Sequence, residues 1–164
     1  MDTLAPELLH CCEQLANALR LRGWMLATAE SCTGGLIAAT CTGLSGSSDW
    51  LDRGFVTYSN AAKTAQLGVP EGLIARHGAV SEAVARAMAE GALRHSLAQV
   101  SVAVTGVAGP TGGSPDKPVG TVWFAWATPQ GLTAERQVFG GDRDAVRTAT
   151  VRHALAGLLR RLEV

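Results

Sequence analysis

The segment WMLATAESCTGGLIAATCTGL (24–44) decides the fold of this chain. Residues 24–30 are mostly apolar and predict a buried strand, and the apolar run that follows Gly35 predicts a helix. A polar turn that contains glycine, residues 31–35, joins the two. The segment is therefore a strand-turn-helix unit, and it leaves Ser31 at the carboxyl end of the strand.

Apolar strands alternate with amphipathic helices along the rest of the chain. Further strands are expected at residues 54–59, 100–104, 121–128 and 132–139, the last two as an antiparallel hairpin. Helices are expected at residues 7–22, 60–68, 70–78, 82–97 and 143–162, with Ser59, Ser81 and Asp142 as N-caps. The sequence therefore predicts a single domain over residues 1–164. Its fold class is α/β, a three-layer α/β/α domain around a mixed, mostly parallel sheet with one antiparallel hairpin.

The composition excludes several classes of partner. Fourteen Lys and Arg balance fourteen Asp and Glu, so no net charge attracts nucleic acid or an anionic membrane, and neither is expected as a partner. Charged residues make up 17% of the chain, against about 25% in an average soluble protein. A sheet covered on both faces or a subunit interface accounts for so few charges, and a homo-oligomer is expected.

The cysteines and histidines show no metal-ligand spacing. No C-x-x-C pair occurs among the cysteines, Cys11, Cys12, Cys32 and Cys41, and the four histidines are scattered singly. We therefore expect no metal, no cofactor and no disulfide framework. The first residues are acidic and amphipathic, and no apolar run approaches the ~18 residues that span a bilayer, so we expect a cytoplasmic protein.

Three polar residues, Ser31, Tyr58 and Thr105, come at the ends of predicted strands. Ligands of α/β sheets gather at the carboxyl ends of strands, so these residues are expected to share one cleft. The segment GVAGPTGGSPDKPVG (106–120) is too rich in Gly and Pro for a plain connector and is interpreted as a functional loop. Its backbone N–H groups are suited to cradle a phosphate, although the loop lacks the G-K-[ST] of a P-loop.

Lys63 is one of only two lysines, the other being Lys117, among fourteen cationic residues. The sequence uses arginine wherever a positive charge is enough, which indicates that Lys63 does something that arginine cannot. A desolvated lysine can lose its proton and act as a base, and beside a serine it would form a Ser-Lys pair. The alternative is an ordinary solvated helix residue.

Ser31 sits where a sharp strand-to-helix turn exposes its hydroxyl below the N–H groups of Cys32, Thr33 and Gly34. Those donors and the positive end of the helix are candidates to hold an oxyanion. The alternative is an ordinary serine N-cap. Cys32 is a rival nucleophile, because helix N-termini stabilise thiolates, but cysteine is equally common as a small buried residue.

Two residues remain as candidates to contact a substrate. Tyr58, the only tyrosine, is able to relay a proton or hold a ligand, or to be an aromatic residue at the edge of the core. Arg143, with Arg147 one turn later, lies at a helix N-terminus and suits an anion, unless it is simply solvated.

Six motifs in this order resemble the nicotinamide-nucleotide amidohydrolase family, which includes the CinA C-terminal domain. They are AESCTGG (29–35), RGFVTYSNAAK (53–63), HGAVSE (77–82), TGVAGPTGG (105–113), KPVGTVWFA (117–125) and GDRDAVR (141–147). The resemblance runs from about residue 8 to the end of the chain.

The resemblance implies hydrolysis of nicotinamide mononucleotide to nicotinate mononucleotide and ammonia, a step of pyridine-nucleotide salvage. It places the nucleophile on Ser31 and the base on Lys63, and it implies no metal. Tyr58 is carried over as a further catalytic residue. The substrate-binding residues expected are Cys32, Thr33, Gly34, Asn60, Thr105, Gly106, Gly112, Gly113 and Arg143.

Two functions from other classes remain open. A non-catalytic nucleotide-binding or regulatory module needs the 106–120 loop but neither Ser31 nor Lys63. A structural oligomerisation domain needs none of them. Release of ammonia from the nucleotide separates the enzyme from both, and binding without turnover separates the module from the structural domain.

Overall fold

The computed structural model describes residues 5–163. Its helices are α1 (Pro6–Arg22), α2 (Leu36–Thr42), α3 (Asn60–Leu67), α4 (Glu71–His77), α5 (Glu82–Arg94) and α6 (Arg143–Leu162), and a short 3-10 turn covers Ser47–Asp49. The strands are β1 (Leu26–Glu30), β2 (Leu51–Val56), β3 (Val100–Gly106), β4 (Thr121–Thr128) and β5 (Gly131–Val138).

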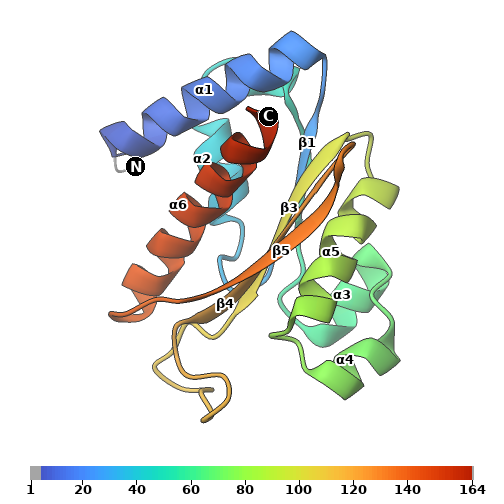
Figure 1. Cartoon of the computed structure of the whole chain (residues 1–164), viewed down its shortest axis with the longest axis vertical. Coiled ribbons are helices and arrows are strands. Elements are labelled where there is room, and N and C mark those ends of the chain that lie inside the picture. The colour runs from blue at the N-terminus through green and yellow to red at the C-terminus, as the bar shows by residue number, and fades with distance from the viewer. Residues whose placement is uncertain (1–4, 164) are drawn as a thin grey trace.

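The five strands form one mixed sheet in the order β2-β1-β3-β4-β5 (Figure 1). Strand β1 is parallel to β2 and β3, whereas β4 is antiparallel to both β3 and β5. All strands except β4 therefore run in one direction. The predicted mixed, mostly parallel sheet with one antiparallel hairpin is confirmed.

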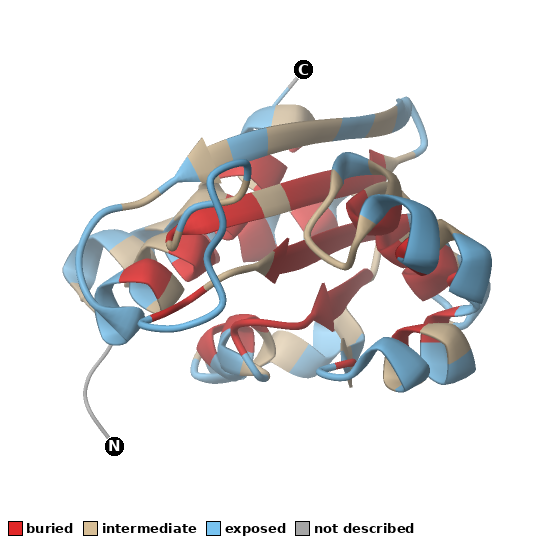
Figure 2. Cartoon of the chain, turned by 90° about the horizontal axis from the view of Figure 1, so that it is seen from below, coloured by how far each residue is buried: buried red, intermediate tan, exposed pale blue. Residues whose placement is uncertain are grey.

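Helices cover both faces of the sheet, which confirms the three layers. Helices α1, α2 and α6 lie on one face and α3, α4 and α5 on the other (Figure 1). Strands β1 and β3 are buried along almost their whole length, and β4 is nearly so (Figure 2). Strand β5 lies at an edge of the sheet and alternates between exposed and half-buried residues. The low content of charged residues thus reflects a sheet that is packed on both sides.

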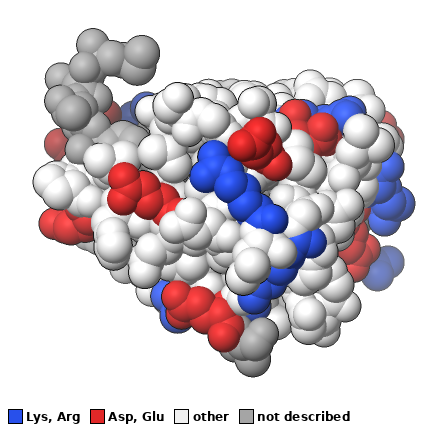
Figure 3. Space-filling view, turned by 90° about the horizontal axis from the view of Figure 1, so that it is seen from above, with Lys and Arg blue, Asp and Glu red and all other residues white. Residues whose placement is uncertain are grey.

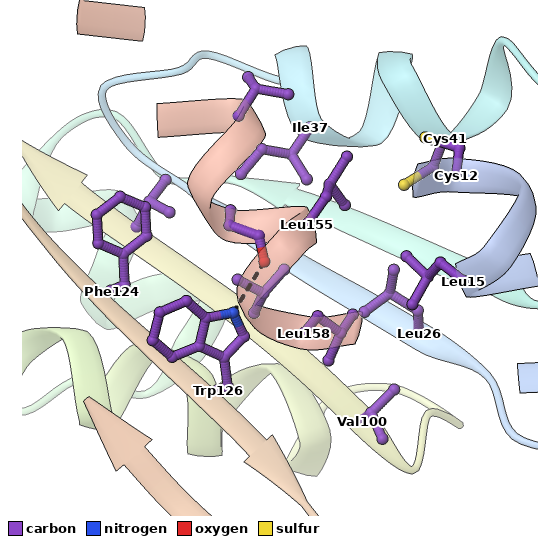
Figure 4. Packing of buried hydrophobic residues seen from close by; sticks show 14 of the residues in the cluster. Cys12, Leu15, Leu26, Ile37, Cys41, Val100, Phe124, Trp126, Leu155 and Leu158 are labelled. Carbon is purple, nitrogen blue, oxygen red and sulfur yellow. Dashed lines mark hydrogen bonds between the residues drawn. The ribbon is translucent and has the colours of Figure 1, made fainter. Parts of the chain in front are cut away.

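The larger of the two hydrophobic clusters lies between the sheet and the layer of α1, α2 and α6 (Figure 4). Its largest side chains are Trp50 and Trp126, both fully buried. The indole Nε1 of Trp126 donates a hydrogen bond to the carbonyl of Ala154 at 2.9 Å. Gly157 lies against the same indole ring, and a Cβ there would overlap it. A glycine is therefore needed where α6 crosses β4.

The three predicted N-caps are all confirmed. The side chains of Ser59, Ser81 and Asp142 accept hydrogen bonds from N–H groups in the first turns of α3, α5 and α6. The cap at Ser59 sets the start of α3 and with it the position of Lys63 on that helix. The cap at Asp142 does the same for Arg143 and Arg147 on α6.

Two predicted elements differ from the observed ones by three residues, and the others agree within two residues. The strand predicted at 54–59 is β2, Leu51–Val56, and Tyr58 lies beyond its end. The reason is that its neighbour β1 ends at Glu30, which pairs with Val56, so β2 has no partner further along. The helix predicted to reach residue 97 ends at Arg94.

Within residues 5–163, none of the helices combines the length and the apolar character that a membrane crossing requires.

Candidate active site

Ser31 and Lys63 meet across the end of the sheet. Ser31 follows directly on β1, and Lys63 extends from α3 until its Nζ lies 3.1 Å from the Ser31 Oγ. The side chain of Lys63 is almost completely buried, with 1% of the residue exposed. Its Nζ also lies within hydrogen-bond distance of the carbonyl oxygens of Thr57, at 3.2 Å, and Tyr58, at 3.4 Å. The interpretation of Lys63 as a solvated helix residue is therefore wrong.

Burial shifts the protonation equilibrium of this lysine. Loss of water around Nζ lowers the pKa of Lys63 below its usual value, and the neighbouring Cys32 opposes that change. Among residues 5–163 no carboxylate lies within ion-pair distance of Nζ. The neutral amine is thus favoured more than in a surface lysine, and a neutral amine is able to accept the proton of the serine hydroxyl.

A cavity of about 350 Å³ opens beside this pair. The predicted site residues that line it are Ser31, Cys32, Tyr58, Asn60, Lys63, Thr105, Gly106, Gly112 and Arg143. Its wall also includes residues 107–109 and 111 of the glycine-rich loop, and residues 79 and 80 between α4 and α5. The expected convergence of Ser31, Tyr58 and Thr105 on one cleft is therefore what the fold produces.

Three predicted residues do not line the cavity. Thr33 is fully buried, and its hydroxyl donates to the Glu30 carboxylate at 2.5 Å. Gly34 has a φ of +58° and closes the turn after Ser31. Gly113 is packed against Val119, where a Cβ would lie 2.9 Å from the backbone nitrogen.

Of the donors predicted for an oxyanion, the N–H of Gly34 and those of the first turn of α2 are bound within the protein. The buried carboxylate of Glu30 accepts hydrogen bonds from the N–H groups of Ile37 at 2.8 Å and Ala38 at 3.1 Å. The N–H of Gly34 donates to the Ser31 carbonyl at 3.1 Å. A carboxylate at a helix N-terminus satisfies the donors that the ligand would need. Sequence reasoning missed Glu30, although its place directly before the turn was a signal.

Cys32 lies in the cavity wall with its thiol toward Gly106. Burial raises the pKa of this thiol to about 11, against the lowering influence of Arg147 and Lys63. At neutral pH a thiol of this kind carries almost no thiolate, which is the nucleophilic form. Cys32 is therefore a packing residue and a poor rival to Ser31.

Arg143 and Tyr58 form the rim of the cavity. The Arg143 guanidinium donates to the carbonyl of Gly109 at 2.7 Å and to the Tyr58 hydroxyl at 3.2 Å. These contacts connect the first turn of α6, the glycine-rich loop and the segment that follows β2. Tyr58 remains 63% exposed, so its ring faces solvent at the mouth of the cavity and is not an aromatic residue of the core.

Thr105 ties the end of β3 to the segment between α4 and α5, and both line the cavity. Its hydroxyl donates to the carbonyl of Ala79 at 2.9 Å, and the residue is 1% exposed. Gly112, in the glycine-rich loop, has a φ of +92°, a conformation that a residue with a side chain rarely adopts. At Gly112 the loop therefore presents only backbone to the cavity.

Residues 5–163 contain no group of three or more His, Cys, Asp and Glu side chains that could hold a metal ion. The polar groups that line the cavity include the Ser31 hydroxyl, the Lys63 amine and the Arg143 guanidinium. This set is suited to nucleophilic attack on an acyl carbon and to binding of an anion.

Comparison with known proteins points to one family. A profile of the CinA C-terminal domain matches residues 9–162. The chain is 53% identical over 153 residues to nicotinamide-nucleotide amidohydrolase PncC of Escherichia coli strain K12, covering 93% of each chain. It is 56% identical over 146 residues to the protein of the same name from Pseudomonas putida, covering 89% of this chain and 91% of the relative.

Longer proteins contain the same region as one part. A CinA-like protein of Syntrophobacter fumaroxidans is 50% identical over 152 residues, which are 92% of this chain and 36% of that protein. Among solved structures, the competence/damage inducible protein CihA of Agrobacterium tumefaciens superposes with a TM-score of 0.95 at 43% identity, with all of both chains covered. A CinA superfamily protein of Escherichia coli superposes with a TM-score of 0.92 at 38% identity, covering 98% of this chain and 94% of the other.

Proposed function

The chain belongs to the CinA C-terminal domain family, and from this membership and the cavity geometry we propose that it deamidates nicotinamide mononucleotide through Ser31 and Lys63. Its activity class is that of a nicotinamide-nucleotide amidohydrolase, because it shares more than half of its residues with enzymes of that name over nearly the full length of both chains. The products are nicotinate mononucleotide and ammonia.

One observation carries the proposed mechanism, the 3.1 Å contact between the Lys63 Nζ and the Ser31 Oγ in a buried site. Burying a lysine without a carboxylate partner destabilises a protein, so a chain that does so gains something other than stability. A base beside the hydroxyl is that gain. A nucleotide-binding or regulatory module would require the glycine-rich loop but not this pair.

The reaction proceeds in two steps. In the first, the Ser31 Oγ attacks the carboxamide carbon while its proton passes to the neutral Nζ of Lys63. The tetrahedral adduct collapses, the C–N bond breaks, and the Lys63 ammonium returns the proton to the departing nitrogen, which leaves as ammonia. In the second, Lys63 takes a proton from water as it attacks the acyl ester. The ester C–O bond then breaks as the Lys63 ammonium returns that proton to the Ser31 Oγ, which regenerates Ser31, and nicotinate mononucleotide leaves.

The substrate phosphate is proposed to bind at the rim. Arg143 lies in the cavity wall, and its guanidinium is suited to bind phosphate oxygens. The nearby loop around Gly112 presents backbone N–H groups as further donors. On the molecular face seen in Figure 3, cationic and anionic side chains are interspersed. With a formal net charge of zero, the chain exerts little long-range attraction, so the phosphate is recognised by local contacts at the cavity.

The experiment that tests the function is release of ammonia by the purified protein. Nicotinamide mononucleotide, nicotinamide riboside, NAD and nicotinamide are compared at equal concentrations, with Ser31→Ala as the control. We expect the mononucleotide to have the highest kcat/KM. For the riboside, which lacks the phosphate, we expect mainly a higher KM. Binding of the mononucleotide without ammonia release would instead identify a regulatory module, and no binding at all a structural domain.

Two further properties are part of the proposal. A homo-oligomer is supported by the apolar side chains of Leu36 and Val56, which are 38% and 45% exposed. Sedimentation velocity tests it, and a single monomer species at assay concentration would contradict it.

A cytoplasmic location is supported by the four free cysteines, since a reducing compartment keeps thiols unpaired.

A further inference from the structure

Arg147 holds the turn that carries the nucleophile. From α6, its Nε donates to the Cys32 carbonyl at 3.2 Å and a terminal nitrogen donates to the Thr33 carbonyl at 3.3 Å. The residue is half-buried and does not line the cavity. Its donors are thus directed at the backbone of the turn, although the sequence suggested an anion site shared with Arg143.

Because peptide units are planar, hydrogen bonds to the carbonyls of the turn also orient its N–H groups. In a trans peptide unit the C=O and the N–H point to opposite sides. Holding the Cys32 carbonyl toward α6 therefore turns the N–H of Thr33 away from α6. In the preceding unit the Ser31 carbonyl accepts from the N–H of Gly34, so the N–H of Cys32 points away from Gly34.

These two N–H groups are the donors left over in the turn. Neither the Cys32 nor the Thr33 N–H donates to an oxygen of residues 5–163, whereas the N–H of Ser31 donates to Val104. Cys32 lies in the cavity wall beside Ser31. Since Glu30 occupies the start of α2, the turn itself is the source of free donors directly next to the nucleophile in the chain.

We propose that Arg147 is a positioning residue for amide hydrolysis, which holds the Cys32 and Thr33 carbonyls and so fixes the turn in which the free N–H of Cys32, beside Ser31 in the cavity wall, receives the oxyanion. The inference rests on the proposed function. The planar guanidinium of arginine can donate to two neighbouring carbonyls at once, and the single ammonium group of lysine is less suited to do so.

The test combines turnover with a reaction that does not require the natural substrate. Wild type, Arg147→Ala and Arg147→Lys are assayed for kcat and KM with nicotinamide mononucleotide. Each is also treated with an alkyl fluorophosphonate, and labelling of Ser31 is followed by intact mass and peptide mapping. In that reaction the Ser31 oxygen bonds to phosphorus, the P–F bond breaks, fluoride leaves, and the proton goes to Lys63, while the phosphoryl oxygen occupies the oxyanion position.

Arg147→Ala is expected to lower kcat and the labelling rate together by ~10²-fold, the size of losing one oxyanion donor, with KM changed less than about threefold. Arg147→Lys should fall between wild type and the alanine variant. Added guanidinium, far below concentrations that unfold proteins, should restore part of the activity of Arg147→Ala, and equal sodium chloride should not. A merely structural role would not produce this rescue.

Arg152→Ala is the matched control, because Arg152 lies on the same helix and pairs with Glu7 on the surface. It should leave kcat and labelling unchanged. Wild-type rates in Arg147→Ala, or a change confined to KM, would overturn the inference, and so would loss without any guanidinium rescue in a variant whose circular dichroism is native. If wild type labels at Ser31 but releases no ammonia, the proposed function fails and the labelling rates alone decide the role of Arg147.

Discussion

The Nζ of Lys117 donates to the backbone carbonyl of His77 at 2.8 Å. This bond fastens the glycine-rich loop to the last turn of α4. Arg143 fastens the other end of the same loop through the carbonyl of Gly109. The two lysines of the chain thus serve different purposes, since Lys63 is buried beside the nucleophile and the half-buried Lys117 ties the loop to α4.

Lys117→Met should weaken substrate binding more than chemistry. The variant keeps most of the side-chain length but loses a charge-assisted hydrogen bond, and the loop gains freedom at the cavity wall. We expect KM for nicotinamide mononucleotide to rise about three- to tenfold with kcat within about twofold of wild type. Steady-state kinetics measure both, and a loss in kcat with unchanged KM would show that the loop does not act through binding.

Ser31→Ala should abolish turnover while leaving the fold intact. The change removes one hydroxyl at a turn that other hydrogen bonds hold in place. We expect kcat to fall by ~10³-fold or more, as for loss of a nucleophile, with the mononucleotide still bound. Calorimetry measures binding of the mononucleotide, and an ammonia assay measures turnover. More than about a tenth of the wild-type rate would point to direct attack by water.

Lys63→Arg should be almost as inactive as Lys63→Ala, because arginine keeps the charge but does not give up its proton. In wild type, the lowered pKa of Lys63 places the rise of kcat with pH below the ordinary titration of a lysine. Activity should increase as pH rises through that folded-state pKa, because the neutral amine is the base, and then level off. A pH-rate profile without this limb, or near-normal activity in Lys63→Arg, would contradict the role.

Stability in acid should depend on Glu135, which joins β5 to α6 through His153 at 2.8 Å and Arg161 at 3.4 Å. Partial burial by itself raises the pKa of Glu135, but the hydrogen bonds and charges of His153 and Arg161 outweigh it and lower the pKa. Because the folded-state pKa is the lower one, this stabilisation is present above the unfolded-state pKa and is lost as pH falls through the folded-state value.

Urea unfolding of wild type and Glu135→Gln between about pH 3 and pH 7 measures this effect, since a carboxyl group titrates near pH 4. The difference in unfolding free energy should shrink as the pH falls. The surface variant Glu90→Gln, whose partner Arg94 lies 3.9 Å away on the exposed side of α5, is the control and should show little pH dependence. A constant difference for Glu135→Gln at all pH values would refute the linkage.

Thr28→Val should stabilise the fold. Thr28 is fully buried in β1, and its hydroxyl has no hydrogen-bond partner among the described residues. Exchanging an unpaired buried hydroxyl for a methyl group of similar shape should raise the free energy of unfolding by about 1 kcal/mol. Thr121→Val is the matched control, because the buried Thr121 donates to the Pro118 carbonyl at 2.6 Å and should lose stability. Equal effects of the two substitutions would disprove the reasoning.

The sequence alone was enough for the features that depend on near neighbours in the chain. Alternating helices and apolar strands predicted the three layers, and Ser59, Ser81 and Asp142 predicted the starts of three helices. Capping and periodicity act within one or two turns, so they can be read locally. The scarcity of lysine also singled out Lys63, whose importance is a matter of residue choice and not of geometry.

Only the tertiary structure decided how the groups around Ser31 are used. The Nζ of Lys63 reaches Ser31 because the end of β1 and α3 pack together, and Arg147 reaches Cys32 from a helix more than a hundred residues away. Glu30 was an ordinary acid in the sequence until the strand-to-helix turn brought its carboxylate onto the N–H groups of α2. Hydrogen bonds between distant segments depend on how whole elements pack, and no local pattern of residues encodes them.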